Sequence, residues 1–166
     1  MRRVGILTVS DRGSQGAYED RSGPLAAEII QEATGWLVER REVIPDEISV
    51  IAGTLRKWCD AGLDLILTSG GTGFAPRDVT PEATRAVIER EAPGIAEALR
   101  AESLRVTRHA MLSRAVAGMR GGTLIINLPG NPKAVRENLD VLLPVLPHAL
   151  DLLTGQPESG QDHRAV

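Results

Sequence analysis

Short apolar runs alternate with amphipathic segments along the chain, and each run ends in a polar loop. Four runs have the length and the β-branched content of buried strands: residues 4–9, 36–43, 63–68 and 123–127. The second run is more polar than the first, which indicates a position near an edge of a sheet. Because strands alternate with helical segments, the pattern predicts an α/β fold in which helices cover both faces of a mainly parallel sheet.

The first two helices are predicted from proline, glycine and apolar spacing. A helix begins near Pro24, whose missing N–H is harmless at a first helical position, and ends at Gly35. Apolar residues from Ile48 to Cys59 recur on one helical face and give the clearest amphipathic helix.

Three further helices are expected in the second half of the chain. One starts with Thr80 as its N-cap and runs to residue 88, and another extends over residues 93–104. The last starts after the cap Asn131, and Pro144 and Pro147 within its apolar pattern predict a kink or a restarted helix.

Composition narrows the class of protein. The 166 residues carry 19 basic and 22 acidic side chains, a net charge of -3, and only 2% are aromatic, which argues against nucleic-acid binding. The apolar runs are too short to cross a bilayer, and no signal-peptide pattern develops, so a cytoplasmic protein without membrane association is expected. We expect one domain over residues 1–154 and a loose polar tail over residues 155–166.

Polar loops follow three of the predicted strands, at residues 10–13, 69–78 and 128–132. In open parallel sheets, ligands usually bind beyond the carboxyl ends of the strands. Function is therefore expected in these loops.

The glycine-rich segment at residues 70–73 is a candidate for binding an anion. Its sequence, Gly-Gly-Thr-Gly, lets backbone N–H groups approach a phosphate, although a tight turn explains it equally well. It matches neither a Walker A loop nor the dinucleotide-binding pattern. Thr72, Arg77 and Asp78 add a hydroxyl, a guanidinium and a carboxylate to the same loop. An Arg–Asp pair is usually a surface ion pair, but beside a glycine cradle it becomes a candidate for binding phosphate and magnesium.

A second carboxylate could complete such a site. Magnesium usually takes one or two protein carboxylates, and Asp78 can supply one. Asp46 follows the second strand at the same edge of the predicted sheet, so the fold could bring it near Asp78. Its spacing alone, however, favours a helix cap, because Pro-Asp before a helix is ordinary capping chemistry.

The start of the last helix is another anion-binding candidate. Pro129 and Gly130 precede the capping Asn131, and Lys133 adds positive charge near the helix N-terminus. The proline and glycine could equally be turn residues.

Few other side chains are candidates for a catalytic, binding or metal-ligating role. Ser113 and Arg114 offer a hydroxyl and a guanidinium, although such a pair is more often an exposed helix surface. The three histidines show neither metal-ligand spacing nor a Ser-His-Asp arrangement. Cys59 is the single cysteine, which excludes a disulfide framework and a cysteine-built metal site.

Taken together, five ordered segments closely resemble the MogA/MoaB family of molybdenum-cofactor biosynthesis proteins. They are residues 8–12, 68–73, 76–84, 112–115 and 127–134. Each segment alone is weak, but the ordered set is specific and covers nearly the whole chain. The Arg-Asp-Val-Thr-Pro form at residues 77–81 and Pro-Asp-Glu at 45–47 look more like the MogA branch than the MoaB branch.

The resemblance implies a molybdopterin adenylyltransferase. Such an enzyme transfers AMP from ATP to molybdopterin with magnesium and releases pyrophosphate. The resemblance further implies a three-layer α/β/α sandwich with one antiparallel strand, and a homotrimer. The two functional acidic positions of the family fall on Asp46 and Asp78, which are therefore expected to be catalytic and to hold the metal.

The resemblance also implies which residues contact the substrates. Residues 70–73 would hold the nucleotide, Ser113 and the 129–133 loop would face the pterin phosphate, and Arg77 or Lys133 could offset remaining charge. The expected binding residues are Ser10, Asp11, Gly70, Gly71, Thr72, Gly73, Arg77, Ser113, Pro129, Gly130, Asn131 and Lys133.

Three rival functions remain open at this point. A MoaB-type protein could bind molybdopterin as a scaffold without adenylylating it. A molybdate-insertion protein shares a related domain but carries additional domains, and it is also a candidate partner for handing on the product. A nucleotide hydrolase would turn over ATP without a pterin acceptor.

Overall fold

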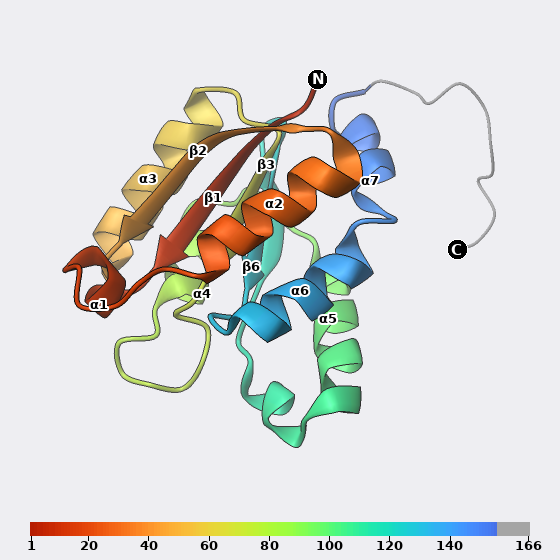
Figure 1. Cartoon of the computed structure of the whole chain (residues 1–166). Helices are drawn as coiled ribbons and strands as arrows, with labels where there is room; N and C mark the ends of the chain where they lie inside the picture. Colours follow the sequence, from red (N-terminus) through yellow and green to blue (C-terminus); the bar gives the residue numbers. More distant parts are fainter. Residues whose placement is uncertain (156–166) are drawn as a thin grey trace.

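A computed structural model of the chain describes residues 1–155 (Figure 1). Six strands form one sheet in the order β2-β1-β3-β6-β5-β4. The first four of these are mutually parallel, whereas β5 runs antiparallel to β6 and β4 antiparallel to β5. The strands are β1 (Arg3–Val9), β2 (Leu37–Ile44), β3 (Leu65–Ser69), β4 (Arg90–Glu91), β5 (Ala117–Arg120) and β6 (Thr123–Leu128).

Helices cover both faces of the sheet and form two apolar cores. On one face lie α2 (Ser22–Thr34), α5 (Pro93–Val106), α6 (Pro132–Leu142) and α7 (Leu146–Leu153). On the other lie α3 (Ile48–Asp60) and α4 (Thr80–Arg85). Two short elements, α1 (Asp11–Ser14) and the 3-10 helix η1 (Arg108–Leu112), belong to connecting loops. The predicted three-layer α/β/α sandwich with one strand antiparallel to the rest is confirmed.

Most elements lie where the apolar pattern predicts them. The four predicted runs are the four parallel strands, and the more polar one among them, residues 36–43, is the edge strand β2. Gly35 caps α2, and Asn131 accepts hydrogen bonds from the N–H groups of Lys133 and Ala134 at the start of α6. Pro144 lies between α6 and α7, and Pro147 lies in the first turn of α7, so the helix restarts as expected.

Two local expectations are wrong. Thr80 is the first residue of α4 rather than its N-cap, because its buried hydroxyl donates to the carbonyl of Gly70 (2.9 Å). The helix also ends at Arg85, short of the expected residue 88. The strands β4 and β5 were not predicted, because neither contains an apolar run of strand length. They complete the sheet beyond β6.

The register of the parallel strands gathers the polar loops at one edge of the sheet. Val9 pairs with Ile44, Thr8 with Ser69, and Ser69 with Leu128, so the loops after all four parallel strands leave the sheet together. Within residues 1–155, no helix is long and apolar enough to span a membrane. The tail expected to be loose lies almost entirely outside the described residues.

Candidate active site

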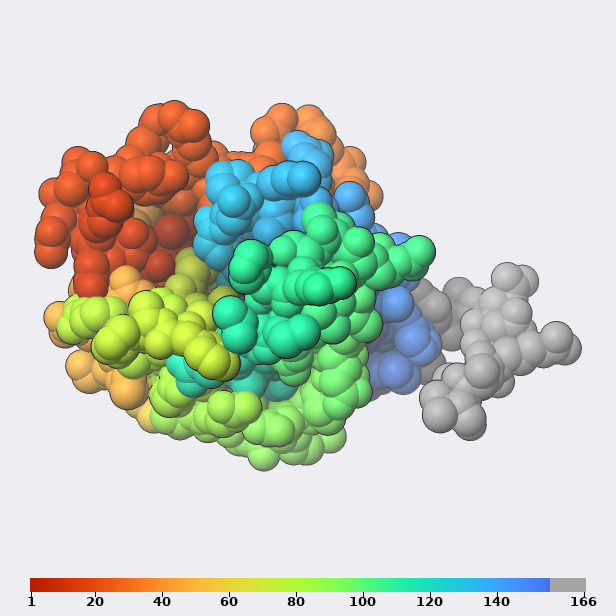
Figure 2. Space-filling model, turned by 90° about the horizontal axis from the view of Figure 1, so that it is seen from below, coloured from red at the N-terminus to blue at the C-terminus, as the bar shows by residue number. Residues whose placement is uncertain are grey.

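Four segments distant in sequence surround the carboxyl ends of the parallel strands. Figure 2 shows this face with the loop after β1 in red, residues 70–80 in yellow-green, η1 in teal and the start of α6 in blue. The fold therefore brings together the loops in which function was expected.

An acidic centre joins the loops after β1 and β2. The backbone N–H of Asp11 donates to Asp46 Oδ2 (2.8 Å), and the N–H of Asp46 donates to Asp11 Oδ1 (3.0 Å). The Arg77 guanidinium donates two hydrogen bonds to the Asp11 carboxylate, from Nε to Oδ2 (2.9 Å) and from Nη2 to Oδ1 (2.8 Å). Arg77 thus pairs with Asp11, not with its sequence neighbour Asp78.

The two carboxylates of this centre differ electrostatically. The Arg77 guanidinium hydrogen-bonded to Asp11 lowers the pKa of that carboxyl. Burial raises the pKa of Asp46, and the negative charges of Asp11 and Asp78 add to the effect. The ionised form of Asp46 is therefore disfavoured by its surroundings and would be stabilised by a nearby cation.

The glycine-rich segment passes close to this acidic centre. Gly71 has φ +67°, and a Cβ built there would lie 2.4 Å from Thr80 Oγ1 and 3.0 Å from Asp46 Oδ1. Gly70 has φ +98°, and its Cβ would lie 2.4 Å from the carbonyl oxygen of Val9. Both positions combine a left-handed backbone with no room for a side chain, so only glycine fits them without strain. The backbone consequently runs directly beside the Asp46 carboxylate.

Asp78 lies at the far end of the same loop. Its Oδ2 accepts a hydrogen bond from the N–H of Ala75 (3.0 Å), and its own N–H donates to the carbonyl of Ala75 (2.9 Å). A Cβ on Gly73 would lie 2.9 Å from Asp78 Oδ2, so the carboxylate faces back toward the glycine segment.

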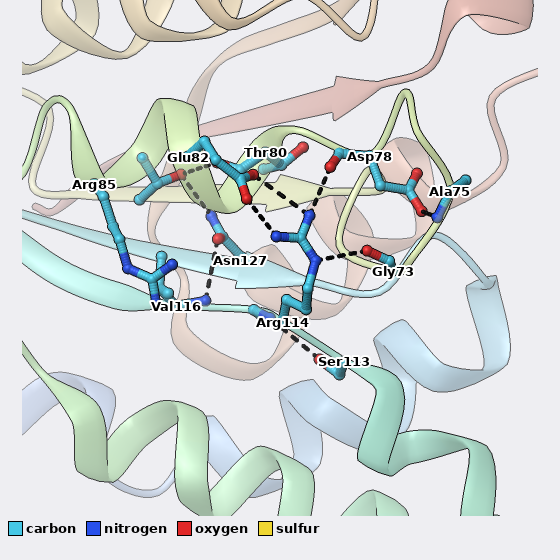
Figure 3. Close-up of polar contacts among 12 residues, drawn as sticks. Gly73, Ala75, Asp78, Thr80, Glu82, Arg85, Ser113, Arg114, Val116 and Asn127 are labelled. Carbon is cyan, nitrogen blue, oxygen red and sulfur yellow. Dashed lines mark hydrogen bonds and ion pairs between the residues drawn. The ribbon is translucent and has the colours of Figure 1, made fainter.

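Arg114 connects this loop to α4 (Figure 3). Its Nε donates to the carbonyl of Gly73 (2.8 Å) and its Nη2 to the carbonyl of Asp78 (2.6 Å). The same guanidinium forms an ion pair with Glu82. The backbone N–H of Arg114 donates to the carbonyl of Thr72 (2.8 Å). The hydrogen bond from Arg114 lowers the pKa of Glu82.

A buried hydrogen-bond network supports the loop from below. The side-chain amide of Asn127 on β6 donates to the hydroxyls of Thr68 and Thr84 (2.9 Å each), and its oxygen accepts from the N–H of Val116 (3.2 Å). Thr84 in turn donates to the carbonyl of Thr80 (2.8 Å). The network joins β3, β6, α4 and the start of β5, and satisfied buried networks of this kind fix one arrangement of the chain.

Two cavities flank the glycine segment. The first, of about 290 Å³, is mostly apolar and lies between the loop, η1, α5 and α6; Thr72, Gly73, Ser113 and Pro129 line one side of it. The second, of about 130 Å³, is lined by Ser10, Gly70 and Gly130 together with residues of the α1–α2 connection. A Cβ on Gly130 would lie 3.4 Å from the Cα of Gly70, so the two glycine loops meet between the cavities.

The expected site residues therefore fall into three neighbouring groups: the acidic centre and the linings of the two cavities. Two residues stand apart from them. Asn131 serves as the cap of α6, and Lys133 points along that helix, with Nζ 3.9 Å from Glu137.

Two interpretations made from spacing alone are wrong. Asp46 does not cap α3, because its carboxylate binds the N–H of Asp11 and no side-chain cap is present at that helix. Ser113 and Arg114 do not lie on a helix surface, since they follow η1 in a segment that is neither helix nor strand, with Ser113 in extended backbone.

Sequence reasoning missed two structural roles. The spacing of Thr80 and Thr84, one helical turn apart, could have indicated a pair of buried hydroxyls. Nothing in the sequence indicates that Arg114 reaches the carbonyls of Gly73 and Asp78, because that contact depends on the shape of the loop.

Known proteins are similar to this chain over most of its length. A molybdopterin adenylyltransferase from Helicobacter pylori is 45% identical over 92% of this chain and 88% of its own length. The molybdopterin biosynthesis enzyme MoaB from Thermus thermophilus has a solved structure with a TM-score of 0.87 and 56% identity, over 95% of this chain and 99% of that one. Gephyrin from Dictyostelium discoideum is 46% identical over 98% of this chain, which spans about a quarter (24%) of gephyrin's length.

The family model described as a probable molybdopterin binding domain matches residues 5–148. That range contains all of the site residues described above. The chain belongs to this molybdopterin-binding family of molybdenum-cofactor biosynthesis proteins, in which both MogA and MoaB are found.

Proposed function

We propose that this protein is a molybdopterin adenylyltransferase, which transfers AMP from ATP to molybdopterin and releases pyrophosphate. One observation carries the proposal: the carboxylates of Asp46 and Asp78 approach the backbone of a glycine segment that lies between two cavities. Relatives named molybdopterin adenylyltransferase at 45% identity support it.

The donor set suits Mg²⁺, which we propose is held by Asp46 and Asp78. Among residues 1–155, no group of three or more acidic, histidine or cysteine side chains is arranged to hold a metal. Magnesium does not need such a group, because it usually takes one or two carboxylates and completes its shell with water and substrate phosphates. The raised pKa of Asp46 has the negative charge of Asp78 among its causes, which is the electrostatic situation that a cation relieves.

The transfer reaction requires the protein mainly to position the two substrates and to neutralise phosphate charge. The terminal phosphate of molybdopterin is already anionic, so its oxygen can attack the α-phosphorus of ATP without a strong base. A bond forms between that oxygen and the α-phosphorus, and the bond from the α-phosphorus to the pyrophosphate oxygen breaks. When bound, Mg²⁺ supplies neutralisation of phosphate charge.

Residues of this chain would orient the two substrates. Backbone N–H groups of residues 70–73 would contact phosphate oxygens, and Ser113 in the larger cavity, with the 129–133 loop, would face the pterin phosphate. Arg77 and Lys133 are proposed to offset the remaining negative charge of the phosphates. Ser10 and Asp11, in the loop after β1, are proposed to contribute to substrate binding from that side.

The decisive experiment incubates the purified protein with molybdopterin, ATP and magnesium. We expect adenylyl-molybdopterin and pyrophosphate, identified by chromatography and mass spectrometry, in amounts that depend on both substrates. Tight pterin binding without release of pyrophosphate would identify a scaffold instead. ATP turnover without a pterin acceptor would identify a nucleotide hydrolase.

Assembly and location complete the proposal. We propose a cytoplasmic homotrimer that passes its product to a molybdate-insertion protein. Sedimentation equilibrium is expected to give three times the chain mass of 17.8 kDa. A stable monomer at micromolar concentration would contradict the trimer.

A further inference from the structure

We infer that Arg114 is a positioning residue: it fixes both ends of the loop at residues 73–78 and thereby sets where the Asp78 carboxylate lies. The inference rests on the proposed function, because it assigns Arg114 a part in the same transfer reaction. Arg114 itself is not proposed to touch either substrate.

The loop that carries Asp78 needs such a support. Residues 74–77 are all exposed, and Phe74 has 69% of its surface in contact with solvent. The loop has an internal turn between Ala75 and Asp78, and its tip is tied to the first loop by the exposed ion pair between Arg77 and Asp11. Exposed ion pairs hold their partners weakly.

Arg114 acts at the base of this loop instead. A guanidinium is planar and presents several N–H donors at fixed angles, so it can hold separate acceptors at fixed positions. Here Nε holds the carbonyl of Gly73 and Nη2 holds that of Asp78, so residues 73 and 78 are both fixed to one rigid group. These two hydrogen bonds are partly buried, and an exposed ion pair with Glu82 also joins the same guanidinium to α4.

The same segment also touches the larger cavity. Ser113 lines that cavity, and the N–H of Arg114 donates to the carbonyl of Thr72, another residue of its lining (2.8 Å). Residues 113 and 114 therefore link the lining of the cavity to the glycine segment and to Asp78. Arg114 can keep the proposed metal ligand in register with a substrate that occupies the cavity.

The test compares Arg114→Gln with Arg120→Gln. Arg120 is a matched control, because its side chain is 31% exposed against 33% for Arg114, and it contacts a carboxylate and one backbone carbonyl, outside the 73–78 loop, where Arg114 contacts a carboxylate and two carbonyls. Arg114→Lys is the second variant, since lysine keeps the positive charge beside Glu82 but lacks the fork that reaches both carbonyls.

Two readouts separate positioning from a general loss of structure. Hydrogen–deuterium exchange of peptides covering residues 70–80 needs no substrate; we expect faster exchange in both Arg114 variants and wild-type exchange in Arg120→Gln. In the adenylylation assay we expect kcat to fall by at least about tenfold in Arg114→Gln, with KM for molybdopterin changed much less, because a misplaced group slows the reaction more than it weakens binding. Arg114→Lys is expected to resemble Arg114→Gln rather than wild type.

The two proposals can fail separately. Wild-type exchange over residues 70–80 and wild-type kcat in either folded Arg114 variant would overturn the positioning role and leave the proposed function intact. Absence of adenylyl-molybdopterin with the wild-type protein would overturn the proposed function, while the exchange experiment would still decide whether Arg114 holds the loop.

Discussion

The two ends of the parallel strands differ in how their charged side chains are paired. At the amino ends, Arg2 pairs with Asp64 (2.9 Å) and with Asp151, and Arg3 pairs with Glu39 (2.5 Å). Asp64, Asp151 and Glu39 thus each have a basic partner. The arrangement joins β1, the loop before β3, β2 and α7.

At the carboxyl ends, by contrast, Asp46 and Asp78 form no ion pair with any of the described residues and accept hydrogen bonds only from backbone N–H groups. Asp11, Asp46 and Asp78 share the region with Arg77, which is committed to Asp11. Negative charge concentrated without partners opposes folding, and functional sites are where such arrangements are kept. The amino ends thus pair their charges in a way that stabilises the fold, whereas the unpaired carboxylates at the carboxyl ends support the proposal that this end binds a cation and phosphates.

The largest expected effect comes from removing one charge at the carboxyl end. Asp78→Asn keeps an oxygen that can accept the hydrogen bond from Ala75, but it lacks the negative charge that Mg²⁺ needs. We expect the adenylylation rate to fall on the order of a hundredfold, while molybdopterin affinity and the melting temperature change little. Rates measured against magnesium concentration, with calorimetric binding and melting curves, check this. Near-normal turnover in the folded variant would leave Asp46 as the principal acidic candidate.

A substitution at the amino end should show the reverse behaviour. Arg2→Ala removes a largely buried guanidinium, 16% exposed, and leaves Asp64 and Asp151 without it. We expect Tm to fall by about 3–6 °C with kcat nearly unchanged, because the loss is one of folding free energy remote from the reaction. Lowered kcat at a temperature where the variant is fully folded would show that the two ends are coupled.

The smallest expected effect is a change in Tm on substitution of Asp46, and it tests the contrast between the two ends of the sheet most directly. Because the pKa of Asp46 is raised in the folded protein, its ionisation destabilises the fold at neutral pH. Asp46→Asn removes that charge and keeps an acceptor for the N–H of Asp11, so we expect Tm at pH 7 to rise by about 2 °C, while the adenylylation rate falls no further than in Asp78→Asn.

The pH dependence gives the control for this effect. The gain in Tm should shrink as the pH falls toward the ordinary aspartate value of 3.8, where Asp46 is protonated in the wild type. Asp64→Asn at the other end should instead lower Tm at pH 7, since it breaks the pair with Arg2. An equal loss of stability in both variants would refute the contrast between the two ends.

The sequence allowed the strands and the meeting of the loops to be predicted, because apolar runs and polar breaks are local properties. The strand β5 escaped prediction, since Ala117–Arg120 carries little apolar signal and is defined by pairing with β6. The pairing of Arg77 with Asp11 and the reach of Arg114 to Gly73 also escaped, because they depend on how loops 66 and 41 residues apart are arranged in space. Asp46 needed the family resemblance, as its spacing favoured a helix cap.

The contact between Gly70 and Gly130 bears on how this site tolerates mutation. The Cβ of any other residue at position 70 would lie 2.4 Å from the Val9 carbonyl oxygen, whereas a Cβ at position 130 would only reach van der Waals contact with the Gly70 Cα (3.4 Å). Because backbone atoms, not side chains, form the obstruction, a second substitution nearby cannot create the missing space. In a library of random variants, position 70 should therefore remain glycine even where the surrounding loops diverge freely.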